Sequence, residues 1–174
     1  KNRENGWVSE KVKRNYLEIN SLQDLNEGDK PSNDYSLSLI DPINFQLNKF
    51  FYKNIGKKHK WVDRLIWTEE QWIDYVSSDR VKTYVLKFKD DLVGFFELIY
   101  HKEIKEVEIA YFGILEEYQN KKLGSYLLSE AIKKSFKDNV SRVWVHTCSL
   151  DHKNALNNYI SRGMKIFKTE ILNI

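Results

Sequence analysis

The pattern of apolar and polar side chains along the chain predicts a protein of mixed α/β class. Alternation with a period of two residues, which is typical of β-strands, recurs in several segments. These segments are residues 12–19, 83–89, 92–100, 106–114, 142–148 and 164–172. The three strands between residues 83 and 114 are separated by short polar turns at 90–91 and 102–103. We therefore expect them to form an antiparallel meander.

Two helices are expected between the first strand and this meander. Asp41-Pro42 provides an N-cap and a first-turn proline, and apolar residues at helical spacing continue the first helix to about residue 54. Thr68 and Gln71 have the spacing of a capping box, in which each side chain accepts a hydrogen bond from a free amide at the helix start. The turn-rich segment 28–38, which precedes both helices, is predicted to be a loop.

Two further helices follow the meander. Residues 123–137 carry two adjacent apolar rows at i, i+4 spacing with lysines on the other sides, which predicts a helix packed on the sheet. Asp151 is the expected N-cap of the last helix, which Gly163 ends. The predicted order is strand, two helices, three strands, helix, strand, helix and strand. The sheet should be mixed, mostly antiparallel and flanked by helices.

The composition favours a single domain over residues 1–174, with residues 1–10 as a flexible tail. Lys and Arg number 28 against 25 Asp and Glu, so no strong positive field favours nucleic acid or an anionic membrane. Cys148 is the only cysteine and the four histidines have no ligand spacing, so we expect neither an internal disulfide nor a metal site. The polar first ten residues and the lack of an apolar run of membrane length predict a soluble protein. The lone Cys148 fits a reducing, cytoplasmic setting.

The segment that joins the strand at 106–114 to the helix at 123–137 is the most informative part of the chain. A helix start offers free backbone amides and the positive end of the helix dipole to an anion, and Lys121 and Lys122 add positive charge. A pyrophosphate group fits such a site. Neither a Walker P-loop nor a G-x-G-x-x-G dinucleotide motif occurs in the sequence, so these two kinds of nucleotide site are excluded.

Two motifs resemble those of the GNAT superfamily of acyl-coenzyme A-dependent N-acyltransferases. The string QNKKLG at 119–124 resembles the coenzyme A loop, usually [QR]-x-x-G-x-[GA], with Lys122 in place of the first Gly. The string ALNNYISRGM at 155–164 resembles the closing helix, with His152 in place of the Asn that usually stands seven residues before its tyrosine, Tyr159. The strings FFELIY, VEIAYFGIL, WVHTCSLDH and NNYISRGM are similar to a bacterial subgroup of the superfamily without an assigned substrate.

The resemblance implies acetyl-CoA as co-substrate and an amine as acceptor. The pyrophosphate then lies against the amides of residues 119–125, and the pantetheine arm runs along 109–114, where this strand splays from the one that starts near 142. Tyr159 is implied as the general acid for the departing thiolate, Glu108 as the base, and Glu97 as the second candidate base. An amide between Phe112 and Ile114 is implied as the oxyanion donor. The implied cofactor-binding residues are Phe112, Gly113, Ile114, Gln119, Asn120, Lys121, Lys122, Leu123, Gly124, Ser125, His152 and Ala155.

Other interpretations of the same residues stay open. Alternating glutamates on a strand more often form a solvated sheet face than a catalytic base. The fold also suits a non-catalytic domain that binds acyl-CoA or a protein partner. Lysines and aromatic residues near the proposed site allow a nucleic-acid binder, although the small net charge and the lack of an RNA or DNA motif argue against it. The acceptor and the oligomeric state, a homodimer included, are left undetermined.

Overall fold

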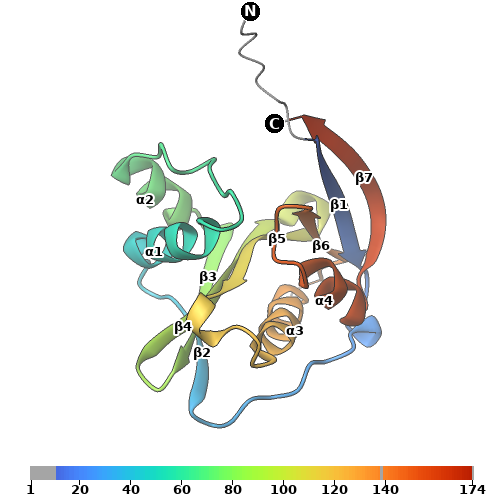
Figure 1. Cartoon of the computed structure of the whole chain (residues 1–174), viewed down its shortest axis with the longest axis horizontal. Helices are drawn as coiled ribbons and strands as arrows, with labels where there is room; N and C mark the ends of the chain where they lie inside the picture. Colours follow the sequence, from blue (N-terminus) through green and yellow to red (C-terminus); the bar gives the residue numbers. More distant parts are fainter. Residues whose placement is uncertain (1–10, 138, 174) are drawn as a thin grey trace, which may run out of the picture.

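The computed structural model describes residues 11–137 and 139–173, and the tail predicted at residues 1–10 lies outside them. Its strands are β1 (Lys11–Ile19), β2 (Tyr35–Leu39), β3 (Val81–Phe88), β4 (Asp91–His101), β5 (Glu106–Ile114), β6 (Arg142–Cys148) and β7 (Lys165–Asn173). Its helices are α1 (Phe45–Gly56), α2 (Glu69–Ser77), α3 (Leu123–Ser135) and α4 (Ala155–Ser161). The described residues form a mixed α/β fold built on one seven-stranded sheet, which confirms the predicted fold class (Figure 1).

The sheet has the strand order β2-β3-β4-β5-β6-β1-β7. Neighbouring strands are antiparallel, apart from β5 and β6, which run parallel. Residues 106–108 of β5 pair with residues 142–144 of β6, and beyond this point the two strands separate. The predicted splay is therefore present, and the second half of β5 pairs with β4 alone.

Helices cover both faces of the sheet (Figure 1). Successive residues of β3 and β4 point to opposite faces. Tyr84 and Phe96 belong to a core that α3 completes, whereas Val85 and Phe95 pack with Phe51 of α1. Thus α1 lies on one face of the sheet and α3 on the other.

The segment 35–39 forms strand β2, although its turn-rich surroundings predict a loop. β2 is an edge strand that pairs antiparallel with β3. Tyr35 and Leu37 pack against the core, whereas Ser36 and Ser38 are exposed. The alternation of apolar and polar residues at 35–39 is short and directly follows a polar turn. The sequence alone therefore does not distinguish this strand from the loop before it, and its pairing with β3 does.

The two helices before the meander start at different kinds of cap. Asn44 caps α1, because its side chain accepts a hydrogen bond from the Gln46 amide at 3.2 Å. The prediction that Asp41 is this cap is therefore wrong. At α2, Thr68 and Gln71 form both hydrogen bonds of the predicted capping box, which confirms the start of that helix.

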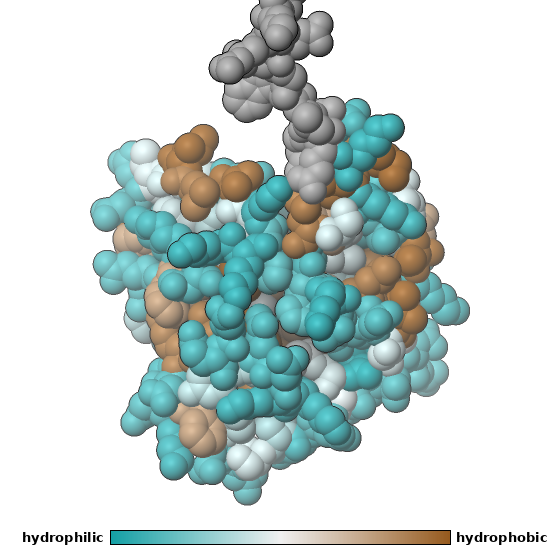
Figure 2. Space-filling view, in the orientation of Figure 1, coloured by the Kyte–Doolittle hydropathy of each residue, from teal (hydrophilic) through white to brown (hydrophobic). Residues whose placement is uncertain are grey.

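Hydrophilic side chains cover most of the face seen in Figure 2, with apolar patches over the connection between α1 and α2 and along β7. Val62, Leu65 and Ile66 of this connection are exposed, as are Phe167 and Ile171 of β7. Among the described residues, none of the helices combines the length and the apolar character needed to cross a membrane.

Candidate active site

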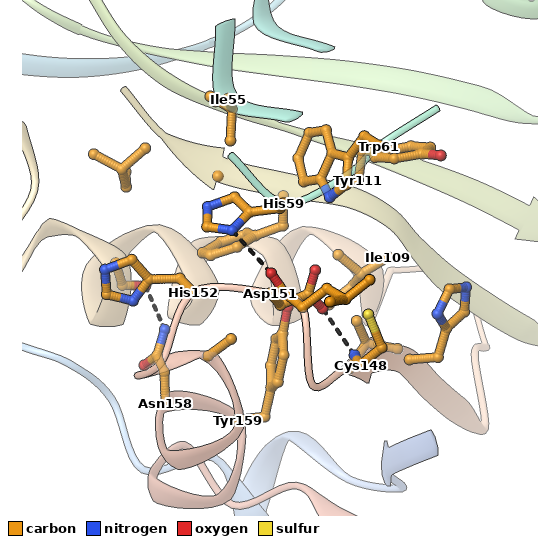
Figure 3. Close-up of a pocket in the computed structure, with 18 of the residues that line it drawn as sticks. Ile55, His59, Trp61, Ile109, Tyr111, Cys148, Asp151, His152, Asn158 and Tyr159 are labelled. Carbon is orange, nitrogen blue, oxygen red and sulfur yellow. Dashed lines mark hydrogen bonds between the residues drawn. The ribbon is translucent and has the colours of Figure 1, made fainter. Parts of the chain in front are cut away.

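A cavity of about 1070 Å³ opens where β5 and β6 separate. Its walls come mainly from β1, β5, β6, the loop before α3, the first turn of α3, α4, and the connection between α1 and α2. Figure 3 shows some of the side chains that line it. Pockets for small molecules have volumes of about 300–1,000 Å³. This cavity is therefore large enough for an extended ligand with a second molecule beside it.

The start of α3 faces this cavity with its backbone amides uncapped. Lys122 is the N-cap residue, and no described side chain caps the helix. Asn120 and Lys122 both have a left-handed backbone, with φ of 64° and 61°. Left-handed residues in a turn bring neighbouring amides to one side and create an anion-binding concavity. This geometry supports the anion site expected at residues 119–125.

Two side-chain hydrogen bonds hold the loop before α3 in place. The Gln119 Nε2 donates to the carbonyl of Ile114 at 3.3 Å, which ties the loop to the end of β5. The Asn158 Nδ2 donates to the carbonyl of Gly124 at 3.1 Å, which ties the first turn of α3 to α4. Gly124 itself has open space beside it, because a Cβ there would meet the Asn158 Nδ2 at 3.6 Å and nothing else described within 4 Å.

Replacing Lys122 with glycine should stabilise the fold. A left-handed backbone costs a non-glycine residue about 1–2 kcal/mol. Glycine adopts it freely, although its larger chain entropy in the unfolded state offsets about 0.5–1 kcal/mol of the gain. We expect Lys122→Gly to raise the free energy of unfolding by about 1 kcal/mol, measured by urea denaturation. Lys121→Gly is the control, because Lys121 has no positive φ. A stability loss in Lys122→Gly would contradict this account.

The edge of β5 at the gap carries amides that do not pair with β4. The Leu115 amide donates to the Val93 carbonyl of β4 at 2.8 Å. Alternate amides of an extended strand point to opposite edges. The amides of Phe112 and Ile114 therefore point away from β4, toward the gap, and both residues line the cavity. The amides of Phe112 and Ile114 are thus left unpaired by β4, and their role as oxyanion donors stays a prediction.

Tyr159 of α4 lines the cavity, although only 6% of its surface is exposed. Its ring centroid is 6.4 Å from that of Phe112 on β5. Burial raises the pKa of Tyr159 well above its usual value, and the charge of Asp151 raises the pKa further. The phenol therefore stays protonated at neutral pH. Its hydroxyl makes no hydrogen bond to another described residue, which leaves the proton available to a ligand.

Asp151 is a cavity residue that the sequence analysis assigns to a helix cap. Asn154 is the N-cap residue of α4, so this assignment is wrong. The Asp151 carboxylate instead accepts hydrogen bonds from the Thr147 hydroxyl and from the Cys148 amide, the latter at 2.9 Å. These bonds hold it in the turn after β6, close to Tyr159 (Figure 3). An Asp four residues before a helix is compatible with a helix cap and with a carboxylate of the cavity wall, so the sequence does not distinguish these two roles.

Glu108, the first predicted base, lies in the wall of the cavity. It is on β5 at the last position that pairs with β6. Its Oε1 is 3.2 Å from the Nε2 of His101 on β4. This contact orients the carboxylate and leaves the Oε2 without a partner among the described residues. His146 of β6 lines the cavity too.

Glu97, the second predicted base, is not part of the cavity wall. Its carboxylate is fully buried and accepts hydrogen bonds from Asn48, Arg64 and Tyr75 at 2.9, 2.9 and 2.7 Å. The Arg64 guanidinium carbon is in turn 4.2 Å from the ring centroids of Tyr75 and Tyr111. A buried carboxylate needs such partners. Glu97 therefore anchors Arg64, and we do not retain it as a candidate base.

Two histidines meet across the cavity (Figure 3). The ring centroids of His59, in the connection between α1 and α2, and of His152, before α4, are 6.2 Å apart. The Nδ1 of His59 is 3.3 Å from the carbonyl oxygen of Leu150. Burial lowers the pKa of His152 most, and the nearby His59 and Lys153 lower it further. The connection between α1 and α2 thus reaches the turn after β6.

The sequence profile of the acetyltransferase (GNAT) family matches residues 45–164. The chain belongs to this family. The search of curated protein sequences found no match.

Solved structures with a similar fold support this assignment. A GCN5-related N-acetyltransferase from Sphaerobacter thermophilus is 14% identical, with a TM-score of 0.72 over 92% of this chain and 50% of that one. A functionally unknown conserved protein from Staphylococcus epidermidis is 16% identical, with a TM-score of 0.63 over 93% and 60%. A GNAT family acetyltransferase from Streptococcus pneumoniae is 21% identical, with a TM-score of 0.57 over 75% and 87%. At these identities the likeness shows the GNAT fold alone, and the chain spans 50% and 60% of the length of the first two proteins.

Most residues that the GNAT resemblance implies do gather around the cavity. Tyr159 and Glu108 line it. So do the implied cofactor-binding residues Phe112, Gly113, Ile114, Gln119, Asn120, Lys122, Leu123, Gly124, Ser125, His152 and Ala155. Lys121 is the exception, because it lies outside this cavity and its ammonium is 5.4 Å from the ring centroid of Tyr118.

Sequence reasoning missed several side chains of the cavity in this GNAT domain. Arg14, Arg64, Asp151 and Asn158 line it as well. Arg14 comes from a strand whose charged residues are explained equally well by solvation. Among the described residues, no group of three or more His, Cys, Asp or Glu side chains is placed to hold a metal ion, and the expectation that no metal takes part stays a prediction.

Proposed function

We propose that this GNAT domain transfers an acetyl group from acetyl-CoA to an amine. One observation carries the proposal: a single cavity connects the uncapped start of α3 to Tyr159 and to Glu108. Val107 and Ile109, the neighbours of Glu108 on β5, pack in the core on the α3 face of the sheet. Glu108 therefore points to the opposite face. The cavity therefore passes through the gap in the sheet, from the α3 face to the opposite one. The cofactor would thus lie on the α3 face of the sheet, and the acceptor on the opposite face.

The residues around the start of α3 fit the coenzyme A part of acetyl-CoA. The amides of residues 119–125 would hold its pyrophosphate, and the Lys122 ammonium adds a positive charge beside them. Gly124 leaves open space in which a ligand can approach the backbone. Residues 109–114 of β5, with amides at the gap, would hold the pantetheine arm. Acetyl-CoA would supply an acetyl group activated as a thioester.

The side chains at the gap account for the proton transfers of the reaction. Glu108 takes a proton from the ammonium of the acceptor, directly or through one water, so that a neutral nitrogen attacks the thioester carbonyl carbon. An amide between Phe112 and Ile114 donates to the oxyanion that forms. Tyr159 protonates the sulfur as the carbon–sulfur bond breaks, so that coenzyme A leaves as a thiol. The ammonium loses two protons in all: one restores Tyr159 through solvent, and the other is released.

Variants of Gly124 test the cofactor side. Because a Cβ at this position makes an ordinary contact, the fold accepts alanine, whereas a tryptophan would fill the space in front of the α3 amides. We expect Gly124→Trp to weaken acetyl-CoA binding at least about 10-fold, or 1.4 kcal/mol, in isothermal titration calorimetry. Gly124→Ala is the matched control for stability, and its thermal unfolding should resemble that of the parent. Release of the coenzyme A thiol with a panel of amines tests the transfer itself.

Each outcome of these measurements has a distinct meaning. Equal binding of acetyl-CoA by Gly124→Trp and the parent would place the pyrophosphate elsewhere. Binding without thiol release from any amine would favour the alternative, a non-catalytic domain that binds acyl-CoA or a partner. No binding of acetyl-CoA at all would overturn the proposed function.

We also propose that the chain acts as one domain in a reducing, cytoplasmic environment. The lone Cys148 supports this setting, because oxidising compartments favour paired cysteines. The similarity of its motif strings to a bacterial subgroup supports a bacterial origin.

A further inference from the structure

Arg14 of β1 is a cation of the cavity wall that forms no ion pair with a carboxylate among the described residues. It lines the cavity, and its Nε is buried without a hydrogen bond in the part of the chain that the structure describes. Glu170, the residue opposite Arg14 on β7, is bound by Lys168 at 2.7 Å and by Tyr16 at 3.3 Å. Lys168 lowers the pKa of Glu170 most, and the charge of Arg14 also lowers the pKa, with a smaller effect, but the side chains of Arg14 and Glu170 form no ion pair. Removing part of a guanidinium from water without a partner is unfavourable. An anionic ligand group would supply the missing partner.

Arg14 lies on the same face of the sheet as Glu108. It pairs with Cys148 on β6, and alternation along β6 puts His146 and Trp144 on that same face. Glu108 pairs with Trp144 from the other side of β6. Arg14, His146 and Glu108 all line the cavity. In the strand order β5-β6-β1, Glu108 and Arg14 therefore flank His146.

The electrostatics of His146 agree with this placement. Burial lowers the pKa of His146 most, and the Arg14 guanidinium lowers the pKa further. The Glu108 carboxylate raises the pKa, as do Asp151 and Asp63, with smaller effects. The imidazole of His146 is thus close enough to Arg14 and to Glu108 for both charges to act on its pKa, and all three residues line the same cavity.

The proposed cofactor site does not use Arg14. Leu17 and Val145, which have the opposite phase to Arg14 and His146, pack in the core that α3 completes. The start of α3 and Lys122 therefore belong to the other face of the sheet. The anionic pyrophosphate is accounted for there, so the charge of Arg14 remains for the acceptor.

We propose that the acceptor is a small amine that also carries a carboxylate, as a free amino acid does. Arg14 would bind the carboxylate, and Glu108 would lie beside the amino group. This inference rests on the proposed acetyl transfer and names its acceptor class. A polyamine would place positive charge against Arg14, and an uncharged amine would leave the guanidinium unpaired. The GNAT family profile matches residues 45–164. Arg14, on which this selectivity depends, lies on β1 and therefore outside the matched segment.

Thiol release from acetyl-CoA, measured with the standard L-amino acids and with their α-carboxamides, tests the proposal. The amides keep the amine and the side chain but lack the carboxylate. We compare the parent with Arg14→Gln, and with Lys13→Gln as the matched control, because Lys13 is the exposed neighbour of Arg14 and lies outside the cavity wall. We expect kcat/KM for the preferred amino acid to exceed that for its amide by about 10- to 100-fold. This preference should vanish in Arg14→Gln and persist in Lys13→Gln.

Several results would overturn this acceptor class without touching the proposed function. Equal use of acids and amides by the parent is one, and thiol release with spermidine but with no amino acid is another. An equal loss for acids and amides in Arg14→Gln would make Arg14 a packing residue. The same compounds are screened by thermal shift on the coenzyme A-loaded protein, where equal shifts with acids and amides also reject the proposal. Failure to bind acetyl-CoA, by contrast, would remove the proposed function itself.

Discussion

Replacing Glu108 with glutamine should lower kcat/KM for acetyl transfer about 10²- to 10³-fold, within the usual contribution of a general base. Glutamine has nearly the same shape and its oxygen still accepts a hydrogen bond from His101, whose Nε2 is 3.2 Å from Glu108. It has no basic oxygen, so the acceptor ammonium would lose its proton to solvent alone. Steady-state release of the coenzyme A thiol measures the effect, and urea denaturation should show little change in stability.

Two other glutamates serve as controls for Glu108. Glu106 lies two residues earlier on the same face of β5, 3.9 Å from Arg142 and outside the cavity wall, so Glu106→Gln should retain the parent rate. Glu97→Gln should instead lower the free energy of unfolding by about 3 kcal/mol, because Arg64 would stay buried without a compensating charge. A folded Glu97→Gln protein without activity, beside an active Glu108→Gln protein, would reverse the two roles.

Replacing Tyr159 with phenylalanine should lower kcat about 10²-fold with the affinity for acetyl-CoA nearly unchanged. The variant keeps the ring, which packs in the core with α3, and removes the proton donor alone. Burial raises the pKa of Tyr159, so the parent phenol is protonated throughout the neutral pH range and can donate as the thiolate departs. Steady-state kinetics and a direct coenzyme A titration of the same protein separate the rate from the affinity.

Tyr126→Phe is the matched control for Tyr159→Phe. Tyr126 is a partly buried tyrosine of α3 that lies outside the cavity wall, so loss of its hydroxyl should leave kcat unchanged. Unchanged turnover in Tyr159→Phe would mean that the thiolate leaves unaided or takes its proton from water. Loss of coenzyme A binding in that variant would make Tyr159 a packing residue instead.

Local patterns were enough to predict most elements of the fold. The alternation in β3 to β5, the two apolar rows of α3 and the capping box at Thr68 and Gln71 all depend on neighbours within about four residues, so they can be read from the sequence. β2 was missed because an edge strand of five residues gains its stability from β3, which is more than 40 residues away in the chain. Similarly, the choice of Asn44 over Asp41 as the cap of α1 depends on backbone conformation as well as residue type.

Some residues of the candidate site could likewise be predicted from local motifs, whereas others could not. The start of α3 and Tyr159 belong to continuous motifs, so the sequence by itself determined the family. The same motifs predicted the coenzyme A loop and the general acid, and both stay predictions. Glu97 and Glu108 both lie in strands with similar patterns, and only the tertiary structure buried one against Arg64 and exposed the other to the cavity. It likewise brought Arg14 of β1 beside β6, through pairing between residues 134 positions apart. The roles of these charged residues depend on neighbours that are distant in the chain, and a local sequence pattern does not show which distant residues come into contact.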